Sequence, residues 1–163
     1  MITQESLLSH AMKIRQASKD DSKWILHHRI EMFKDMGESE ESLSETIRLT
    51  EQYLEEDWTK DYQYFLVEDN DRVIGGCGIS TFRISPQLSQ PAGIYAYLSN
   101  MFIEPECRGK GIGKLLVNYV IDFCKREQIG LLFLHASDKG LPLYKSLGFV
   151  SSERLMHSRT MYF

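Results

Sequence analysis

The densest group of potential ligand-binding residues lies in one short turn, about two-thirds of the way along the chain. Residues 107–114 read Cys-Arg-Gly-Lys-Gly-Ile-Gly-Lys. The glycines let the backbone bend so that its N–H groups point into one concavity, and Arg108, Lys110 and Lys114 add positive charge. A strongly amphipathic helix follows, and its N-terminus adds partial positive charge at the same place. This pattern predicts a cradle for a phosphate or diphosphate group, in preference to a tight turn with solvated lysines.

Two common nucleotide-binding motifs do not fit this turn. A Walker loop requires GxxxxGK[ST], but Gly113-Lys114 is followed by Leu115, and Arg108 occupies the first glycine position. The dinucleotide fingerprint GxGxxG fails because Lys114 stands where its last glycine should be, and because that fingerprint normally follows an early strand. The sequence therefore predicts a phosphate-bearing ligand of another kind.

Two motifs of the chain resemble the signatures of the GNAT acetyltransferase superfamily. Arg108-x-x-Gly111-x-Gly113 matches the (Arg/Gln)-x-x-Gly-x-(Gly/Ala) pyrophosphate signature, and the strand before it is also similar. Residues 143–149, which read Leu-Tyr-Lys-Ser-Leu-Gly-Phe, are similar to the second signature, LYxxxGF. The order and spacing of the two motifs agree with the family over residues 13–163.

The resemblance implies that acetyl-CoA is the acyl donor, and that no metal is needed. In that family the backbone amides of the turn hold the CoA diphosphate. The pantetheine arm pairs with the main chain of the fourth strand, where that strand splays from the fifth, here expected at 131–135. Ser137 stands where many relatives have an asparagine that contacts CoA. The predicted cofactor-binding residues are Met101, Phe102, Ile103, Arg108, Gly109, Lys110, Gly111, Ile112, Gly113, Lys114 and Ser137.

Tyr144 of the second motif is the predicted catalytic residue. Attack of an amine on a thioester creates a developing thiolate. A phenol with an unperturbed pKa of about 10 stays protonated at neutral pH and can donate to that sulfur. The general base is left open. Some relatives have a glutamate eleven residues before the signature arginine, where this chain has Tyr97. A water wire, a backbone carbonyl or an acid from the early helices are the alternatives.

Hydrophobic periodicity predicts a mixed α+β domain that positions these residues. Helices are expected at 18–36, 38–58, 113–127 and 141–147. Strands are expected at 13–17, 62–68, 72–84, 94–103, 129–135 and about 157–162. The resemblance implies the GNAT-type acyl-CoA N-acyltransferase fold. Such a fold has a central, mostly antiparallel twisted sheet with a splay between strands four and five, flanked by about four helices.

Length and composition are those of one soluble domain. The 163 residues suffice for a single core, so we expect an N-terminal leader at 1–11 and one N-acetyltransferase domain at 12–163. The formal charge of −4 makes nucleic acid or an anionic membrane an unexpected partner. The N-terminus lacks the pattern of a signal peptide, and the three cysteines have no CxxC spacing. These features favour a cytoplasmic protein with reduced thiols and no metal site.

The expected reaction is transfer of the acetyl group of acetyl-CoA to a primary amine of a small molecule, by direct attack in a ternary complex. An acyl-cysteine route is not expected, because no His–Asp arrangement supports one. The first alternative is a protein N-terminal or lysine acetyltransferase, whose acceptor would be a peptide amine. The second is a sensor that binds acyl-CoA without catalysis. The protein is expected to be a monomer or a homodimer.

Overall fold

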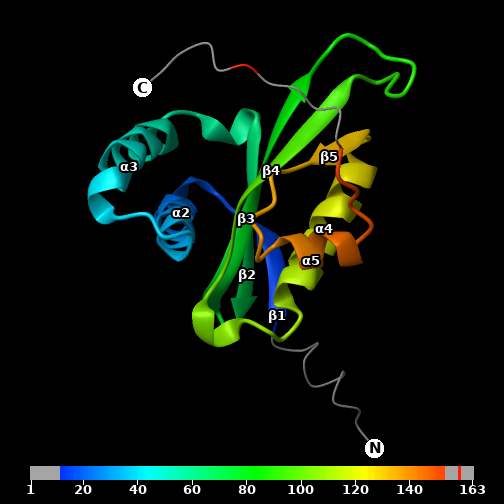
Figure 1. Ribbon diagram of the computed structural model, residues 1–163. Helices are drawn as coiled ribbons and strands as arrows, with labels where there is room; N and C mark the ends of the chain where they lie inside the picture. The colour runs from blue at the N-terminus through cyan, green and yellow to red at the C-terminus, as the bar shows by residue number, and fades with distance from the viewer. Residues whose placement is uncertain (1–11, 153–157, 159–163) are drawn as a thin grey trace, which may run out of the picture.

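The computed structural model describes residues 12–152 and residue 158, which form a central sheet with helices on both faces (Figure 1). The five strands lie in the order β1-β2-β3-β4-β5. The pairs β1–β2, β2–β3 and β3–β4 are antiparallel, and β4 and β5 are parallel. The strands are β1 (Met12–Gln16), β2 (Tyr62–Asp69), β3 (Arg72–Arg83), β4 (Ile94–Ile103) and β5 (Leu131–Phe133).

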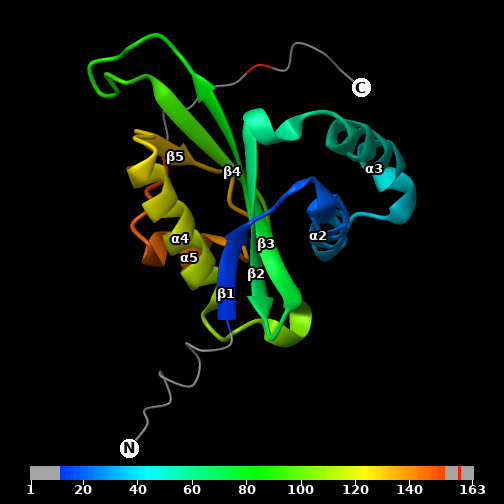
Figure 2. The same ribbon diagram turned by 180° about the vertical axis from the view of Figure 1, so that it is seen from behind.

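The described part of the chain has four α-helices. They flank both faces of the sheet, as the views from the front and from behind show (Figures 1 and 2). Helices α2 and α3 lie on one face, and α4 and α5 lie on the other. Their bounds are α2 (Ser22–Asp35), α3 (Glu40–Glu55), α4 (Ile112–Arg126) and α5 (Leu141–Ser146). Short 3-10 turns are η1 (Lys19–Asp21), η2 (Trp58–Lys60) and η3 (Pro105–Cys107). No helix in the described part of the chain is long and apolar enough to cross a membrane.

The predicted fold class is confirmed, and most elements begin and end within a few residues of their predicted bounds. The fifth strand is an exception, because the prediction of a strand over 129–135 is wrong in its length. Strand β5 has three residues, since it pairs with β4 only from Tyr95–Leu131 to Tyr97–Phe133. The predicted leader at 1–11 and the predicted strand at 157–162 lie outside the described residues, apart from residue 158.

Separate apolar cores on the two faces of the sheet fix the positions of the helices. Alternate side chains of β4, Ala96 and Leu98, pack with Leu116 of α4 on one face. On the opposite face, Ile25 of α2 and Leu54 of α3 are buried in a second cluster. The β4 side chains that alternate with Ala96 and Leu98 therefore point toward the face that α2 and α3 cover.

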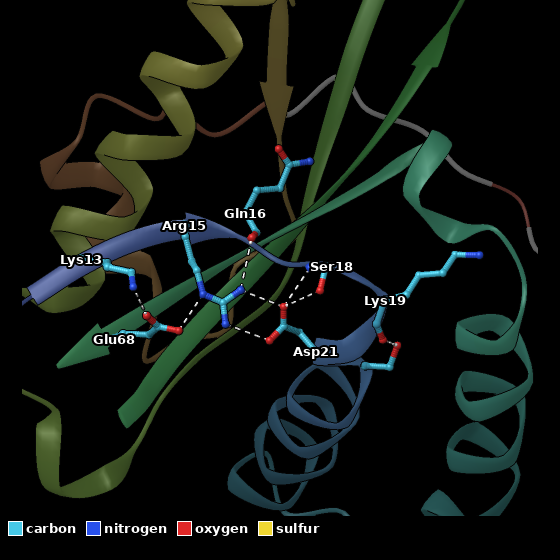
Figure 3. A network of polar contacts seen from close by, with 8 residues as sticks. Lys13, Arg15, Gln16, Ser18, Lys19, Asp21 and Glu68 are labelled. Carbon is cyan, nitrogen blue, oxygen red and sulfur yellow. Dashed lines mark hydrogen bonds and ion pairs between the residues drawn. The ribbon is translucent and has the colours of Figure 1, made fainter. Parts of the chain in front are cut away.

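Figure 3 shows a polar network that attaches the start of α2 to the edge of the sheet. Arg15 of β1 donates hydrogen bonds of 2.8 and 2.9 Å to Asp21 and one of 2.7 Å to Glu68 of β2. Asp21 also accepts from the backbone N–H of Ser18 at 2.9 Å. Lys13 pairs with the other oxygen of Glu68 at 3.0 Å. The network determines where α2 leaves the sheet, and so helps to position the α2 side chains that face β4.

Substitution of Asp21 by Asn is expected to destabilise the fold at neutral pH. Hydrogen bonds from Arg15 hold the pKa of Asp21 at about 2, well below the value of about 3.9 in an unfolded chain. Because the folded pKa is the lower one, this stabilisation is complete above about pH 5 and is lost as the pH falls toward 2. The Arg15 side chain is 34% exposed. We therefore expect a loss of about 1–2 kcal/mol, or roughly 2–8 °C in Tm.

Thermal unfolding of wild type and Asp21→Asn between pH 7 and pH 3 measures this effect. The difference in Tm should be largest at neutral pH and should shrink on acidification. Asp57→Asn is the matched control. Asp57 is 53% exposed, and its ion pair with Lys19 is long, at 3.6 Å, so this pair should add little stability. Equal Tm values for wild type and Asp21→Asn at pH 7 would show that the network adds no stability.

Candidate active site

The site is organised around the point where β4 and β5 part. Their pairing ends at Tyr97–Phe133, and beyond it β4 is bonded to β3 alone. The predicted splay between the fourth and fifth strands is therefore present. Unpaired backbone groups on this edge of β4 are available to a ligand, because an extended strand directs N–H and C=O groups to both sides.

A bulge in β4 places two consecutive side chains, those of Ser99 and Asn100, on the same face of the sheet, toward the cavity side. The register of β4 on β3 shifts between Ser99 and Phe102, so that Asn100 and Met101 oppose one residue of β3. Asn100 has φ 53°, in the left-handed region, and its side-chain amide donates to the carbonyl of Ile25 at 3.1 Å. Met101 packs on the α4 side. Phe102 lies against the α2 side, beside two histidine rings of that helix.

The glycine-rich turn presents a series of unbonded amides to open space. Gly109 and Gly111 have φ 73° and 80°, in the left-handed region, and a Cβ atom on either would meet no protein atom within 4 Å. Gly111 is the N-cap of α4 and provides no side chain to cap its first amides. Among the described residues, no acceptor bonds the backbone N–H groups of residues 109–114. Such amides, at the positive end of a helix dipole, suit an oxyanion.

The side chain of Arg108 holds the turn in place and does not extend into it. Its Nε donates to the carbonyl of Ile103 at 2.7 Å, and Nη2 donates to Asp35 at the end of α2 at 2.6 Å. The guanidinium carbon also lies 5.2 Å from the centre of the Phe102 ring. The Lys110 ammonium donates to the carbonyl of Glu106 at 3.0 Å. The anion-binding capacity of the turn therefore lies mainly in its backbone amides.

Gly113 allows α4 to begin close to β4 and α5. A Cβ atom on this glycine would lie 3.4 Å from both Met101 Cε and Leu143 Cδ2, at the short limit of van der Waals contact. Ile112, next to it, is buried in the core. Because α4 starts here, its free amides lie beside the diverging edge of β4. The two predicted motifs are thus brought together, since α5 carries the second.

Tyr144 is placed by α5 against the core beneath α4. It is 8% exposed, and its ring lies edge-on to Phe149 at 5.6 Å between centroids. Burial raises the pKa of Tyr144 to about 12, so the phenol stays protonated at neutral pH. Its hydroxyl has no hydrogen-bond partner in the part of the chain that the structure describes. Ser137 lies in the loop before α5 and accepts from the Gly140 amide at 3.2 Å, which leaves its hydroxyl hydrogen available.

A cavity of about 440 Å³ lies on the other face of the sheet, between α2, α3 and the strands. Its size is within the range of small-molecule sites. Its walls combine apolar side chains with several hydroxyl groups and one arginine. The lining residues are Ile25, Arg29, Thr46, Leu49, Thr50, Tyr53, Leu54, Tyr62, Ser80, Tyr97, Ser99 and Asn100. This cavity was not predicted from the sequence, although the alternation of Tyr97 and Ser99 with the apolar Ala96 and Leu98 was a signal for a polar face on β4.

Tyr97 connects the cavity to the point where the strands part. It lines the cavity, and its hydroxyl lies 3.1 Å from Nδ1 of His135, which follows β5. None of the lining residues is acidic, so no carboxylate from the early helices reaches the cavity. A phenol that is hydrogen-bonded to an imidazole can accept and pass on a proton, and it occupies the position at which some relatives have a glutamate.

The cysteines do not have the environment of nucleophiles. Cys77 and Cys124 are 0% and 5% exposed, and burial raises the pKa of both thiols, that of Cys124 to about 11. Burial therefore disfavours the thiolate form that a nucleophile requires. Cys107 is partly buried in η3. Among the described residues, no group of three or more His, Cys, Asp or Glu side chains is arranged to hold a metal ion.

A sheet that divides between β4 and β5, with a glycine-rich turn leading into the helix that connects these strands, defines the class of N-acyltransferase folds. Within this class, the Acetyltransferase (GNAT) family matches residues 29–149 of the chain. The matched range includes every lining residue of the cavity except Ile25, together with the turn and Tyr144. The chain therefore belongs to the GNAT family, as the two sequence motifs predicted.

Known relatives agree with this assignment. Glucosamine 6-phosphate N-acetyltransferase from Trypanosoma brucei brucei is 26% identical over 92 residues, which cover 56% of this chain and 60% of that protein. The chain thus matches less than two thirds of the length of this relative. A GCN5-related N-acetyltransferase from Ralstonia eutropha JMP134 has a TM-score of 0.81 at 24% identity, covering 92% of this chain and 99% of that one. A predicted acetyltransferase from Clostridium acetobutylicum, solved with acetyl-CoA, has a TM-score of 0.77 at 25% identity, covering 91% and 96%.

Proposed function

We propose that this protein transfers the acetyl group of acetyl-CoA to the primary amine of a small molecule. The observation that carries the proposal is the position of the cavity. It lies on the face of the sheet opposite α4, whose first amides are free, and Tyr97 connects it to the point where β4 and β5 part. A donor bound at the turn and an acceptor bound in the cavity would approach each other from opposite sides of the sheet. This arrangement supports direct transfer in a ternary complex.

The residues of the turn fit the diphosphate of CoA. Six consecutive backbone amides, which are unbonded among the described residues, can donate hydrogen bonds to a doubly charged group. The two left-handed glycines leave room for it, because no protein atom lies near their Cβ positions. The backbone of Met101–Ile103 would bind the pantetheine arm, with Ser137 as a further hydrogen-bond donor. The Clostridium acetobutylicum protein of similar fold was solved with acetyl-CoA, which supports the same donor here.

Tyr144 is the proposed general acid. The donor supplies a thioester, and attack by the acceptor amine expels the thiol of CoA as a thiolate. A buried phenol that stays protonated at neutral pH can donate its proton to that sulfur as the charge develops. The amine must also lose a proton, and the hydrogen-bonded Tyr97–His135 pair lies between the cavity and the point where β4 and β5 part.

A small acceptor is favoured over a protein. The cavity of about 440 Å³ between α2, α3 and the sheet has the volume of a site for a metabolite-sized amine. The relative from Trypanosoma brucei brucei is named for a small phosphorylated amino sugar, which supports the same choice. The alternatives are acetylation of protein N-termini or lysines, and binding of acyl-CoA without turnover.

The decisive experiment is a screen of small amines and peptides with acetyl-CoA, read by release of free thiol. We expect turnover with small amines, with initial-rate lines that intersect when both substrates are varied. Replacement of Cys77, Cys107 and Cys124 together by Ala or Ser should leave substantial turnover, because a ternary complex needs no acyl-cysteine. Parallel lines together with loss of activity in the cysteine-free variant would contradict direct transfer. Binding of CoA without acetylation of any amine would favour the sensor.

A further inference from the structure

Among the described residues, one charged side chain lines the proposed acceptor cavity, and it has no counter-ion there. Arg29 projects from α2 into the cavity, and none of the other lining residues is ionised at neutral pH. Four other arginines, namely Arg15, Arg48, Arg72 and Arg108, each form an ion pair with a carboxylate. Arg83 and Arg126 form none among the described residues, but both are exposed to solvent. Within the described ranges, Arg29 forms no ion pair, and its Nε is buried without a hydrogen-bond partner.

Packing holds the guanidinium of Arg29 in position. Its central carbon lies 5.2 Å from the centre of the Phe33 ring, one helical turn further along α2. The network in Figure 3 fixes the start of the same helix against the sheet. A planar guanidinium that is held in this way is preorganised to bind the two oxygens of an oxyanion at once.

Hydroxyl groups surround the same space and add neutral donors. Thr46 comes from α3, Ser80 from β3 and Ser99 from β4, whereas the Thr50 hydroxyl already donates to the carbonyl of Thr46 at 2.7 Å. Tyr62 is 7% exposed, and burial raises the pKa of its hydroxyl, so this group also remains a donor. A half-buried cation without a counter-ion is unfavourable in the free protein unless a ligand or water satisfies it. One cation among neutral donors is a combination that suits an anion and disfavours a substrate with several positive charges.

We propose that Arg29 binds a carboxylate or phosphate group of the acceptor, so that the preferred acceptors are small amines that also carry an anionic group. The assignment of this anion to the acceptor rests on the proposed acetyl transfer. The oxyanion site itself does not, because it can be measured by binding alone. The charge of Arg29 would orient the molecule with its anionic end in the cavity and its amine toward the point where β4 and β5 part.

The first test measures anion binding without turnover. Inorganic phosphate and succinate are titrated separately into protein saturated with CoA, so that the glycine-rich turn is already occupied, and binding is followed by calorimetry or by the shift in Tm. Wild type should bind at least one of the two anions saturably. Arg29→Gln should weaken that binding by roughly 10–100-fold, the range for a charge-assisted pair.

Two further variants test whether misfolding or a general loss of positive charge could explain this result. Arg29→Met keeps an unbranched apolar chain over Phe33 and should lose anion binding as Arg29→Gln does, so one of the two suffices if the other fails to fold. Arg48→Gln is the matched control, because Arg48 lies on α3, is 59% exposed and does not line the cavity. It should bind as wild type does. Absence of anion binding to wild type, or equal binding to wild type and the Arg29 variants, would overturn the proposal.

The second test uses matched pairs of acceptors that differ in the anionic group. β-Alanine is compared with β-alaninamide, and glucosamine 6-phosphate with glucosamine, while spermidine serves as a polycationic amine. The anionic member of at least one pair should have a kcat/KM higher by roughly 10–100-fold, mainly through KM, and Arg29→Gln should remove that difference. The pair that responds distinguishes a carboxylate from a phosphate.

An equal loss for charged and neutral acceptors in Arg29→Gln would overturn the proposal. Arg29-dependent anion binding without any acetylation would leave the oxyanion site in place and would count against the acetyltransferase function alone.

Discussion

Replacement of Tyr144 by Phe is expected to lower kcat by roughly 10²–10⁴, the usual contribution of one general acid. The substitution keeps the ring and its edge-on contact with Phe149, and removes only the hydroxyl that would protonate the departing thiolate. The affinity for acetyl-CoA should change little, because the interaction strengthens as charge develops on sulfur. Steady-state kinetics with a saturating amine acceptor measure the effect.

Several controls connect this loss to proton transfer. The loss should shrink with an acetyl donor whose leaving thiol is already acidic, because such a thiolate needs no proton. Tyr119→Phe removes a hydroxyl from α4, on a ring that packs against Phe65, and should leave kcat unchanged. Burial raises the pKa of Tyr144 to about 12, so ionisation of this phenol should not lower kcat of the wild type up to about pH 10. A Tyr144→Phe enzyme that turns over at the wild-type rate would remove Tyr144 from the mechanism.

The donor side of the site was predictable from sequence because its determinants are local. The turn requires left-handed backbone at Gly109 and Gly111 and free amides at the start of α4, and these requirements show as a spaced glycine pattern. Tyr144 was predictable for the same reason, since it lies within one short motif. The roles of these residues toward CoA remain predictions, which Tyr144→Phe and Gly111→Glu test.

The acceptor side was not predictable, because it is assembled from distant segments. The cavity takes side chains from α2, α3, β2, β3 and β4, and no local motif connects them. The bulge that turns Asn100 toward α2 depends on pairing with β3, since nothing in residues 94–103 alone requires a left-handed residue there. Arg108 gives a similar lesson, because its partner Asp35 is 73 residues away. From the sequence, the charge of Arg108 predicted contact with an anionic ligand. In the fold, the carboxylate of Asp35 in α2 neutralises that charge.

Introduction of Glu at Gly111 is expected to abolish most of the affinity for CoA. A Cβ atom on Gly111 meets no protein atom within 4 Å, so the new side chain would occupy the open space in front of the free amides. Its carboxylate would also repel a diphosphate there. We expect the Kd for acetyl-CoA to rise by roughly 100-fold or more, equivalent to about 2.7 kcal/mol. Calorimetry, or the increase in Tm on addition of CoA, measures the change.

Backbone strain must be separated from this loss of binding. Gly111 has φ 80°, so any substitution costs about 1–2 kcal/mol of folding stability, apart from any effect on the ligand. Gly37→Glu is the matched control, because Gly37 has φ 93°, also has no atom near its Cβ position and lies outside the turn. Both variants should therefore lose a similar amount of Tm without ligand, while only Gly111→Glu should lose the increase in Tm that CoA produces. If a folded Gly111→Glu protein keeps the full CoA-dependent increase, the diphosphate must bind elsewhere, and the glycine-rich turn is then only a structural connection between β4 and α4.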